Sequence, residues 1–136
     1  MSQMTWTTAQ QAAIDARGQN LLLSAAAGSG KTAVLTERIK KLITDMDDPA
    51  DITELLVLTF TRASAGEMKT RISSGIAKAL SEAEQEQNTP LVRHLSRQLA
   101  LMSSAQISTL DSFFQTLIRR YFYLIDLDPN TKMLTD

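Results

Sequence analysis

Ala25-Ala26-Ala27-Gly28-Ser29-Gly30-Lys31-Thr32, residues 25–32, is the stretch that decides the fold. It follows the phosphate-loop pattern G-x-x-x-x-G-K-[ST], except that alanine stands at the first glycine position. Residues 21–24 before it are mostly apolar and predict a short buried strand, whereas residues 31–43 after it repeat apolar side chains at helical spacing. A loop of small residues between a strand and a helix predicts a site for a nucleoside triphosphate.

The residue types in this loop suit phosphate chemistry. Small residues allow backbone N–H groups to turn inward onto phosphate oxygens, and the start of the following helix attracts negative charge. Lys31 would place a cation on the β- and γ-phosphates, and the hydroxyl of Thr32 would bind Mg²⁺. The alternative is an ordinary strand-to-helix turn that contains glycine and exposes a lysine.

The rest of the chain alternates helical and strand patterns. Strands that alternate with helices pair in parallel through right-handed crossovers, which predicts an α/β fold with both faces of the sheet covered. Three strands make a thin sheet, so we expect the domain to continue beyond Asp136. The expected helices are residues 7–16, 31–43, 62–80, 91–102 and 111–124, and the expected strands are residues 21–24, 54–60 and 105–110.

The composition excludes several classes of protein and site. The 136 residues include 14 Lys and Arg against 15 Asp and Glu, so the chain is not a wholly basic nucleic-acid coat protein. Cysteine is absent and His94 is the single histidine, which excludes disulfides, zinc–thiolate sites and a multi-histidine metal site. No apolar run approaches the ~20 residues of a membrane span.

Nucleotide hydrolysis needs carboxylates that hold Mg²⁺ and position water, usually after an apolar strand. Residues 121–126, which end in Asp126, are the one superficial match to such a Walker B motif. We favour instead a helix end that leads into a polar connection, because the run continues the helical pattern from Asp111, no second acidic residue follows directly, and Pro129 indicates a turn. The chain therefore lacks a complete catalytic set.

Several further motifs occur together in one order along the chain. They are Trp6–Gln10 with Ala13-Ile14, AAAGSGKT (25–32), TFTRASAGEMKTRI (59–72), ISTLDSFF (107–114) and YFYLIDLDP (121–129). This set resembles the start of the UvrD-like superfamily 1 DNA helicases, and within them it is most similar to the A subunits of AddAB helicase–nucleases. The resemblance covers essentially the whole chain.

The resemblance implies a RecA-like P-loop NTPase fold, a parallel sheet with flanking helices of which about three strands are present. It implies that residues 1–136 are the N-terminal part of the first helicase motor domain, ending before the Walker B motif. Gln10 matches the glutamine that reads the adenine edge, for which an amide has the right donor and acceptor; the alternative is a surface glutamine. The implied ATP-binding residues are Gln10, Ala27, Gly28, Ser29, Gly30, Lys31 and Thr32, with Thr32 on Mg²⁺.

The resemblance also implies contacts with single-stranded DNA. The matching residues are Thr59, Phe60, Thr61, Arg62, Ser108 and Thr109. Phe60 would support a base, unless it is simply a core residue. The helix after it carries Arg62, Lys69, Arg71 and Lys78 against Glu67, which suits a DNA backbone or is a solvated charged face. An acid at Asp111 would repel phosphate, so we expect Asp111 or Ser112 to cap the last helix instead. The five aromatic residues of that helix favour core packing over base stacking.

The implied whole protein is the A-type component of an ATP-dependent 3′–5′ DNA helicase and exonuclease that acts in double-strand break repair and recombination. Its implied partners are single-stranded DNA and DNA ends, the remaining domains of its own polypeptide and a B-type subunit; it would be cytoplasmic, without a membrane partner. The chain alone is expected to show little ATPase, helicase or nuclease activity. The alternatives are a non-catalytic nucleotide- or DNA-binding module and, less favoured, a small phosphate-loop kinase.

Overall fold

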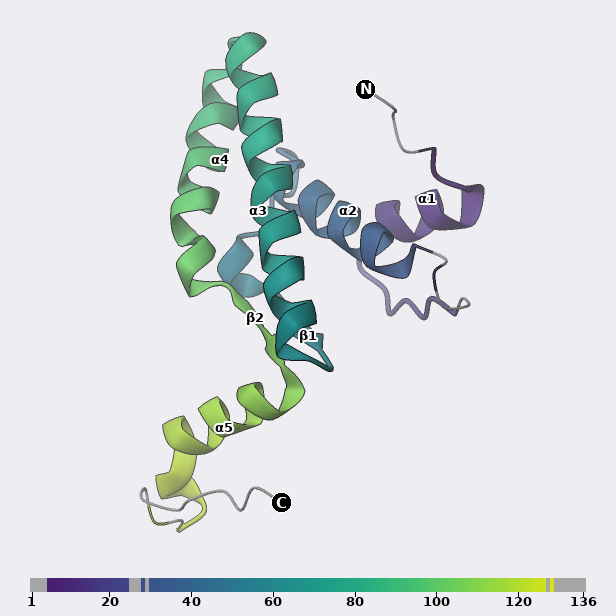
Figure 1. Cartoon of the computed structure of the whole chain (residues 1–136). Coiled ribbons are helices and arrows are strands. Elements are labelled where there is room, and N and C mark those ends of the chain that lie inside the picture. Colours follow the sequence, from purple (N-terminus) through teal and green to yellow (C-terminus); the bar gives the residue numbers. More distant parts are fainter. Residues whose placement is uncertain (1–4, 25–27, 29, 127, 129–136) are drawn as a thin grey trace.

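The computed structural model describes residues 5–24, 28, 30–126 and 128, which are mostly helical with one small parallel sheet (Figure 1). No helix in these ranges is both long and apolar enough to cross a bilayer. With η for a 3-10 helix, the elements are α1 (Thr8–Asp15), α2 (Lys31–Thr44), η1 (Ile52–Glu54), β1 (Leu56–Thr59), α3 (Arg62–Gln85), α4 (Thr89–Leu101), η2 (Met102–Ser104), β2 (Gln106–Thr109), α5 (Leu110–Tyr121) and η3 (Phe122–Leu124).

The sheet consists of β1 and β2, which run parallel and place Thr59 opposite Thr109. Helices α3 and α4 form the connection between them, so the α/β class is confirmed in its coarse form. The expected third strand at residues 21–24 is wrong, because this segment is not a strand and Leu22 is 93% exposed. A strand needs a neighbour to pair its backbone groups, and among the described residues β1 and β2 pair only with each other.

Only one face of the sheet is covered. Val57 is buried in the same cluster as side chains of α2, α3 and α4. Leu56 and Leu58 point to the opposite face, because successive strand residues alternate, and both are exposed. The expected cover on both faces is therefore wrong for the described part of this chain.

The main core lies where α3 packs between α2 and α4. Met68, Ile72 and Ile76 recur every fourth residue along one side of α3, and Ile72 and Ile76 are fully buried. They pack with Ile43 and Leu95 from the neighbouring helices. Each fully buried side chain of this size stabilises the fold by roughly 1.5–3 kcal/mol.

The long helices differ from expectation at their ends. α3 continues to Gln85 rather than residue 80, because residues 81–85 are good helix formers and Ala83 among them is buried. α4 begins earlier than residue 91, since Asn88 caps it by accepting a hydrogen bond from the Leu91 N–H at 3.3 Å.

The last helix, α5, projects away from the body formed by α2, α3 and α4 (Figure 1). None of its residues is buried and Phe114 is 48% exposed, so core packing of the aromatic helix is not found among the described residues. The expected cap at Asp111 or Ser112 is also wrong. Thr109 is the cap, because its Oγ1 accepts from the Ser112 N–H at 3.2 Å, and Asp111 lies in the first turn.

Candidate nucleotide and DNA site

Two glycines with left-handed backbone conformations lie just before α2. Gly28 and Gly30 adopt left-handed conformations, with φ of 78° and 81°, which glycine reaches without a steric penalty. Gly30 is the N-cap residue of α2 and provides no side-chain cap to its first N–H groups. Lys31 and Thr32 follow on an exposed surface, whereas Ala27 and Ser29 lie outside the described residues.

Gln10 lies beside Gly30, although the two residues are twenty positions apart in sequence. Its Nε2 is 3.6 Å from the position that a Cβ on Gly30 would occupy. Gln10 is also the third residue of α1 and forms a capping box with Thr7: the Thr7 N–H donates to Oε1 at 2.9 Å, and the Gln10 N–H donates to the Thr7 hydroxyl at 3.3 Å. The structure therefore brings together Gln10, Gly30 and the start of α2.

Polar contacts hold α1 on α2. Arg38 donates to the carbonyl of Ala13 at 2.7 Å, and Lys41 forms an ion pair with Asp15. Two hydrogen bonds hold the pKa of Asp15 below its ordinary value; the one from Lys41 has the larger effect, and the one from Gln11 the smaller. Because these side chains of α2 bind residues of α1, they hold α1, and with it Gln10, in position relative to Gly30.

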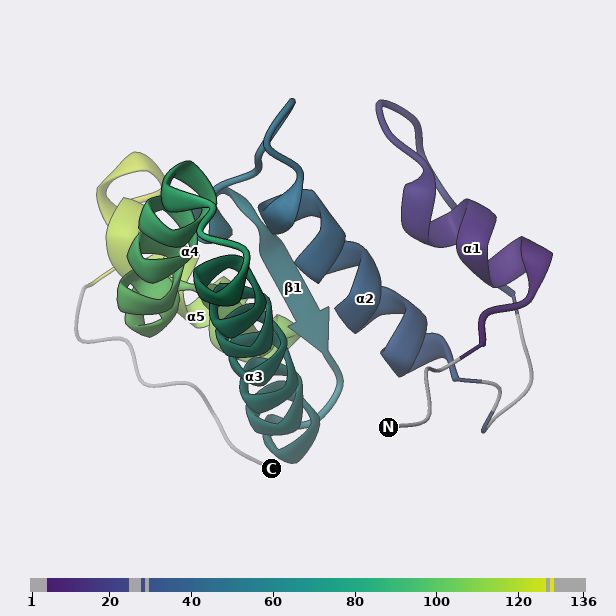
Figure 2. The ribbon, with the colours of Figure 1, turned by 90° about the horizontal axis from the view of Figure 1, so that it is seen from above.

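The expected DNA-contact residues meet at the carboxyl edge of the sheet. Thr59 and Thr109 pair across the two strands, so the segments that follow both strands leave from the same edge. Phe60 is 99% exposed there, which contradicts the alternative that it is a core residue. Arg62 is exposed in the first turn of α3. The arrowhead of β1 and the starts of α2 and α3 lie at the same end of the molecule (Figure 2).

The hydroxyl groups at this edge already have partners within the chain. Thr61 accepts from the Ser64 N–H at 3.1 Å and thereby caps α3, as Thr109 caps α5. Thr59 donates to the carbonyl of Thr61 at 3.0 Å, and Ser108 donates to the carbonyl of Thr109 at 3.2 Å. These residues shape two helix starts, and the remaining first-turn N–H groups are available to a phosphate.

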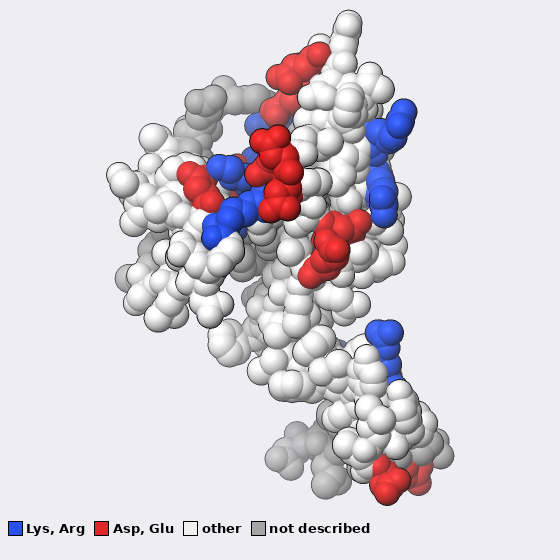
Figure 3. Space-filling model, turned by 180° about the vertical axis from the view of Figure 1, so that it is seen from behind, with Lys and Arg blue, Asp and Glu red and all other residues white. Residues whose placement is uncertain are grey.

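The basic residues of α3 divide between two sides of the helix. Arg71 pairs with Glu67 at 2.6 Å, and Lys78 lies 3.8 Å from Glu82. Arg62 and Lys69 are nearly two whole turns apart and so share the other side. On the face in Figure 3 acidic and basic groups are interspersed and do not merge into a continuous basic stripe. The alternative of a solvated charged face describes Arg71 and Lys78 better than a phosphate track does.

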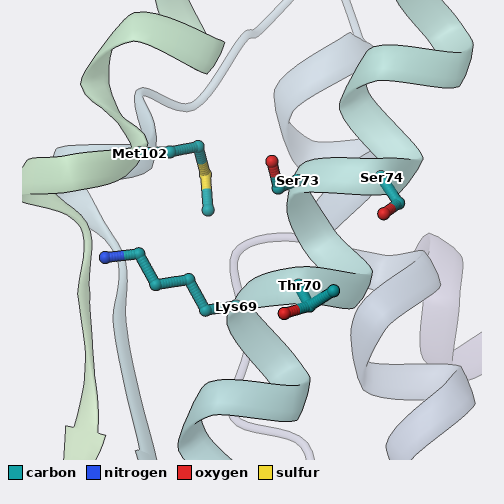
Figure 4. Close-up of a pocket in the computed structure, with 5 residues that line it drawn as sticks. All are labelled: Lys69, Thr70, Ser73, Ser74 and Met102. Atoms are coloured by element: carbon teal, nitrogen blue, oxygen red, sulfur yellow. The ribbon is translucent and has the colours of Figure 1, made fainter.

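One feature that was not predicted from the sequence is a shallow cavity on α3. It has a volume of about 270 Å³ and is lined by Lys69, Thr70, Ser73, Ser74 and Met102 (Figure 4). The sequence signal was the helical spacing of Lys69 and Ser73, four residues apart on one face. The capping box of α1 was likewise visible in the spacing of Thr7 and Gln10.

No group of three or more His, Cys, Asp or Glu side chains that could hold a metal occurs in the described ranges. The residues present nevertheless suit a nucleotide, because they combine left-handed glycines, an open helix start and an ammonium group. A Mg²⁺ ion at Thr32 would take its other ligands from phosphates and water, as this ion commonly does.

Comparison with known proteins gives consistent matches. The family model of the UvrD/REP helicase N-terminal domain matches residues 6–136. The chain is 53% identical over 133 residues to the A subunit of an ATP-dependent helicase/nuclease from Clostridium novyi (strain NT), covering 98% of this chain and 10% of the relative. It is 54% identical over 129 residues to the protein of the same name from Desulfitobacterium hafniense, covering 95% of this chain and 9% of the relative. The chain thus spans about a tenth of these curated relatives.

Proposed function

The chain belongs to the UvrD/REP helicase N-terminal domain family, and we propose that it is the ATP-binding part of the A-type component of a helicase/nuclease, with a RecA-like P-loop fold. The observation that carries this proposal is the grouping of features at one end of the molecule. The starts of α2 and α3 lie there beside the carboxyl edge of the sheet, where ligands bind in open α/β folds (Figure 2).

In this proposal the nucleotide lies at the start of α2. Gly28, Gly30 and the first N–H groups of α2 bind the phosphates, together with Ala27 and Ser29. Lys31 neutralises the β- and γ-phosphates, and Thr32 binds Mg²⁺. Gln10 reads the adenine edge, which its position beside Gly30 supports.

Single-stranded DNA lies along the carboxyl edge of the sheet. Phe60 supports a base, because its ring extends into solvent and offers a flat apolar face. Arg62 and the capped starts of α3 and α5, formed by Thr61 and Thr109, bind phosphates. The nucleotide and the DNA then share one end of the domain, so a change at α2 can reach the DNA through α3, with which α2 packs.

In this proposal the rest of the polypeptide supplies the parts that ATP hydrolysis, movement along DNA and DNA cleavage require. It supplies the carboxylates that hydrolysis requires, a second motor domain and the nuclease, none of which the 136 residues contain. A B-type subunit joins it, and the complex moves 3′ to 5′ along single strands from DNA ends in double-strand break repair. We propose a cytoplasmic location for the protein, because its substrate in this proposal is DNA.

A chimera tests this function. The chain replaces the matching tenth of the Clostridium novyi relative, and ATP hydrolysis is measured with and without single-stranded DNA. We expect DNA-stimulated turnover by the chimera, because a non-catalytic module or a small kinase would not support DNA-dependent hydrolysis. Its Lys31→Ala variant should show none, because the cation that neutralises the β- and γ-phosphates is removed. Equal turnover by a folded chimera and its Lys31→Ala variant would contradict the proposal. DNA-stimulated turnover by the chain alone would show that it needs no further carboxylates.

A further inference from the structure

We propose that the cavity on α3 is a second DNA-binding site, in which Lys69 and Ser73 hold one phosphate of the DNA backbone. The inference rests on the proposed function, in which single-stranded DNA lies at the carboxyl edge of the sheet. It goes further, because it extends the path of the DNA along α3 and selects one lysine of that helix, with a hydroxyl partner, for the contact.

The cavity contains a positive charge that no acidic group neutralises. Lys69 lines it together with hydroxyl-bearing residues and a methionine, and the lining includes no carboxylate. Within the described ranges the ammonium group of Lys69 forms no ion pair, whereas Arg71 lies 2.6 Å from Glu67 and Lys78 lies 3.8 Å from Glu82. Lys69 is therefore the lysine of α3 whose charge is available to an anion, and DNA presents one phosphate anion per nucleotide.

The cavity also offers hydroxyl protons. A serine or threonine on a helix commonly donates its proton to the carbonyl four residues earlier, as Thr70 does to Gly66 at 3.1 Å. Ser73 and Ser74 form no such bond, and neither hydroxyl has a hydrogen-bond partner among the residues that the structure describes. Ser73 lies one turn after Lys69 on the same side of α3, so an ammonium group and a hydroxyl proton can act on one phosphate.

The shape and lining of the cavity favour a phosphate over a base. Its volume of about 270 Å³ exceeds that of a phosphate group, so one phosphate fits without displacing a side chain. Met102 is 6% exposed and extends from η2 toward α3, near Lys69 and Ser73 (Figure 4). No aromatic ring lines the cavity on which a base could stack, in contrast to Phe60 at the edge of the sheet.

The cavity is continuous with the proposed DNA site at the start of α3. Arg62 and Lys69 are seven positions apart, so they share one side of the helix and lie about 10 Å apart along its axis. Gly66 lies between them, and a Cβ at this position would meet nothing within 4 Å among the described residues. Because this surface is open, a strand that passes Phe60 and Arg62 can continue to Lys69.

Three substitutions on α3 test the site. Lys69→Gln removes the charge and Ser73→Ala removes the hydroxyl. Lys78→Gln is the matched control, because it makes the same change of charge on the opposite side of the same helix. Alanine and glutamine are good helix formers, so α3 should remain folded, which circular dichroism and urea unfolding check. The dissociation constant for a labelled oligothymidine of about a dozen nucleotides is measured by fluorescence anisotropy at several salt concentrations.

The expected effects differ between the variants. Lys69→Gln should raise the dissociation constant about tenfold, as for loss of one charged hydrogen bond, and should reduce the log–log salt slope by about 0.7. Ser73→Ala should raise the dissociation constant about fivefold and leave the slope unchanged, because it removes a donor but no charge. Lys78→Gln should stay within about twofold of the wild type, since its charge is distant and screened.

A second measurement uses the unaltered chain. Its lysines are acetylated by an amine-reactive reagent, and mass spectrometry compares the reaction of each with and without oligothymidine or inorganic phosphate. Oligothymidine should protect Lys69 and leave Lys78 reactive, because a phosphate bound in the cavity covers the ammonium group of Lys69 alone. If inorganic phosphate protects Lys69 and oligothymidine does not, the cavity binds a free anion and the inference is overturned.

Failure of the inference is distinguishable from failure of the proposed function. A wild-type chain that does not bind oligothymidine contradicts both. If the wild type binds and Phe60→Ala weakens the binding, while a folded Lys69→Gln keeps the affinity and the salt slope of the wild type, the proposed function stands and the inference is overturned. Equal losses in Lys69→Gln and Lys78→Gln would also overturn it. If Lys69→Gln unfolds, the protection of Lys69 in the wild type decides.

Discussion

Replacement of Phe60 by alanine separates a binding role from a structural one. The ring is 99% exposed in a sharp turn between β1 and α3, so it buries almost no area within the chain. A core phenylalanine would cost about 3–5 kcal/mol on truncation to alanine. Here we expect the free energy of unfolding to change by less than about 0.5 kcal/mol, as for other surface positions.

The expected effect on DNA binding is much larger. Stacking of one base on an aromatic ring is worth about 1–3 kcal/mol. Loss of that contact raises the dissociation constant for single-stranded DNA by roughly 5- to 150-fold. Phe60→Leu should fall between the wild type and Phe60→Ala, because leucine retains apolar contact but has no flat ring.

The assay is fluorescence anisotropy of a labelled oligothymidine of about a dozen nucleotides, in parallel with urea unfolding of the same samples. Tyr123→Ala is the matched control, since Tyr123 is also an exposed aromatic but lies in η3, beyond α5. Its affinity for DNA should equal that of the wild type. The reasoning is refuted if Phe60→Ala binds DNA within twofold of the wild type, or if it lowers the free energy of unfolding by more than about 1 kcal/mol.

Three other side chains give testable expectations from their contacts or charge. Gln98→Leu should lower the free energy of unfolding by about 1–3 kcal/mol in urea titrations, because the buried Gln98 Oε1 accepts from the Ile52 N–H at 2.8 Å and leucine leaves that donor unpaired. Hydrogen bonds from the side chain and backbone of Thr53 lower the pKa of Asp51, so the contribution of Asp51 to stability is complete above the ordinary aspartate pKa and is lost as pH falls through the lowered value. Asp51→Asn should therefore reduce the loss in the free energy of unfolding at acid pH, and an unchanged loss would contradict the assignment. Arg62→Gln should reduce the salt dependence of DNA binding by about one unit of log–log slope, and an unaltered slope would remove Arg62 from the phosphate contacts.

The fold could be predicted from the sequence where the signal was local. Helical periodicity located α2, α3 and α4, and the apolar runs located β1 and β2. The segment at residues 21–24 could not be judged in this way, because a strand also requires a neighbour with which to pair, and its apolar composition carries no information on that. The ends of helices depended on caps such as Asn88, which are decided by one side-chain hydrogen bond.

For the candidate site the sequence predicted residue types, which remain a prediction, and it carried less information on their contacts. The parallel pairing of two strands at Thr59 and Thr109 joins motifs that are fifty residues apart, as the α/β pattern implied. The sequence left the environment of Phe60 open, since an aromatic residue after a strand suits a core position, and only the structure shows that Phe60 is exposed. It also placed the cap of α5 at Asp111 or Ser112 rather than Thr109, because several neighbouring residues were all good capping types and only the backbone path selects one.

The most direct test of the account is the dependence of nucleotide affinity on the number of phosphates. Calorimetric titration of the chain with AMP, ADP and ATP in the presence of Mg²⁺ should show affinity rising at each added phosphate, because in the proposed function Gly28, Gly30 and the start of α2 bind the polyphosphate. Lys31→Ala should abolish the rise from ADP to ATP while the fold is retained. Equal affinities for AMP and ATP, or a rise that persists in Lys31→Ala, would contradict the claim that this turn is a phosphate-binding loop.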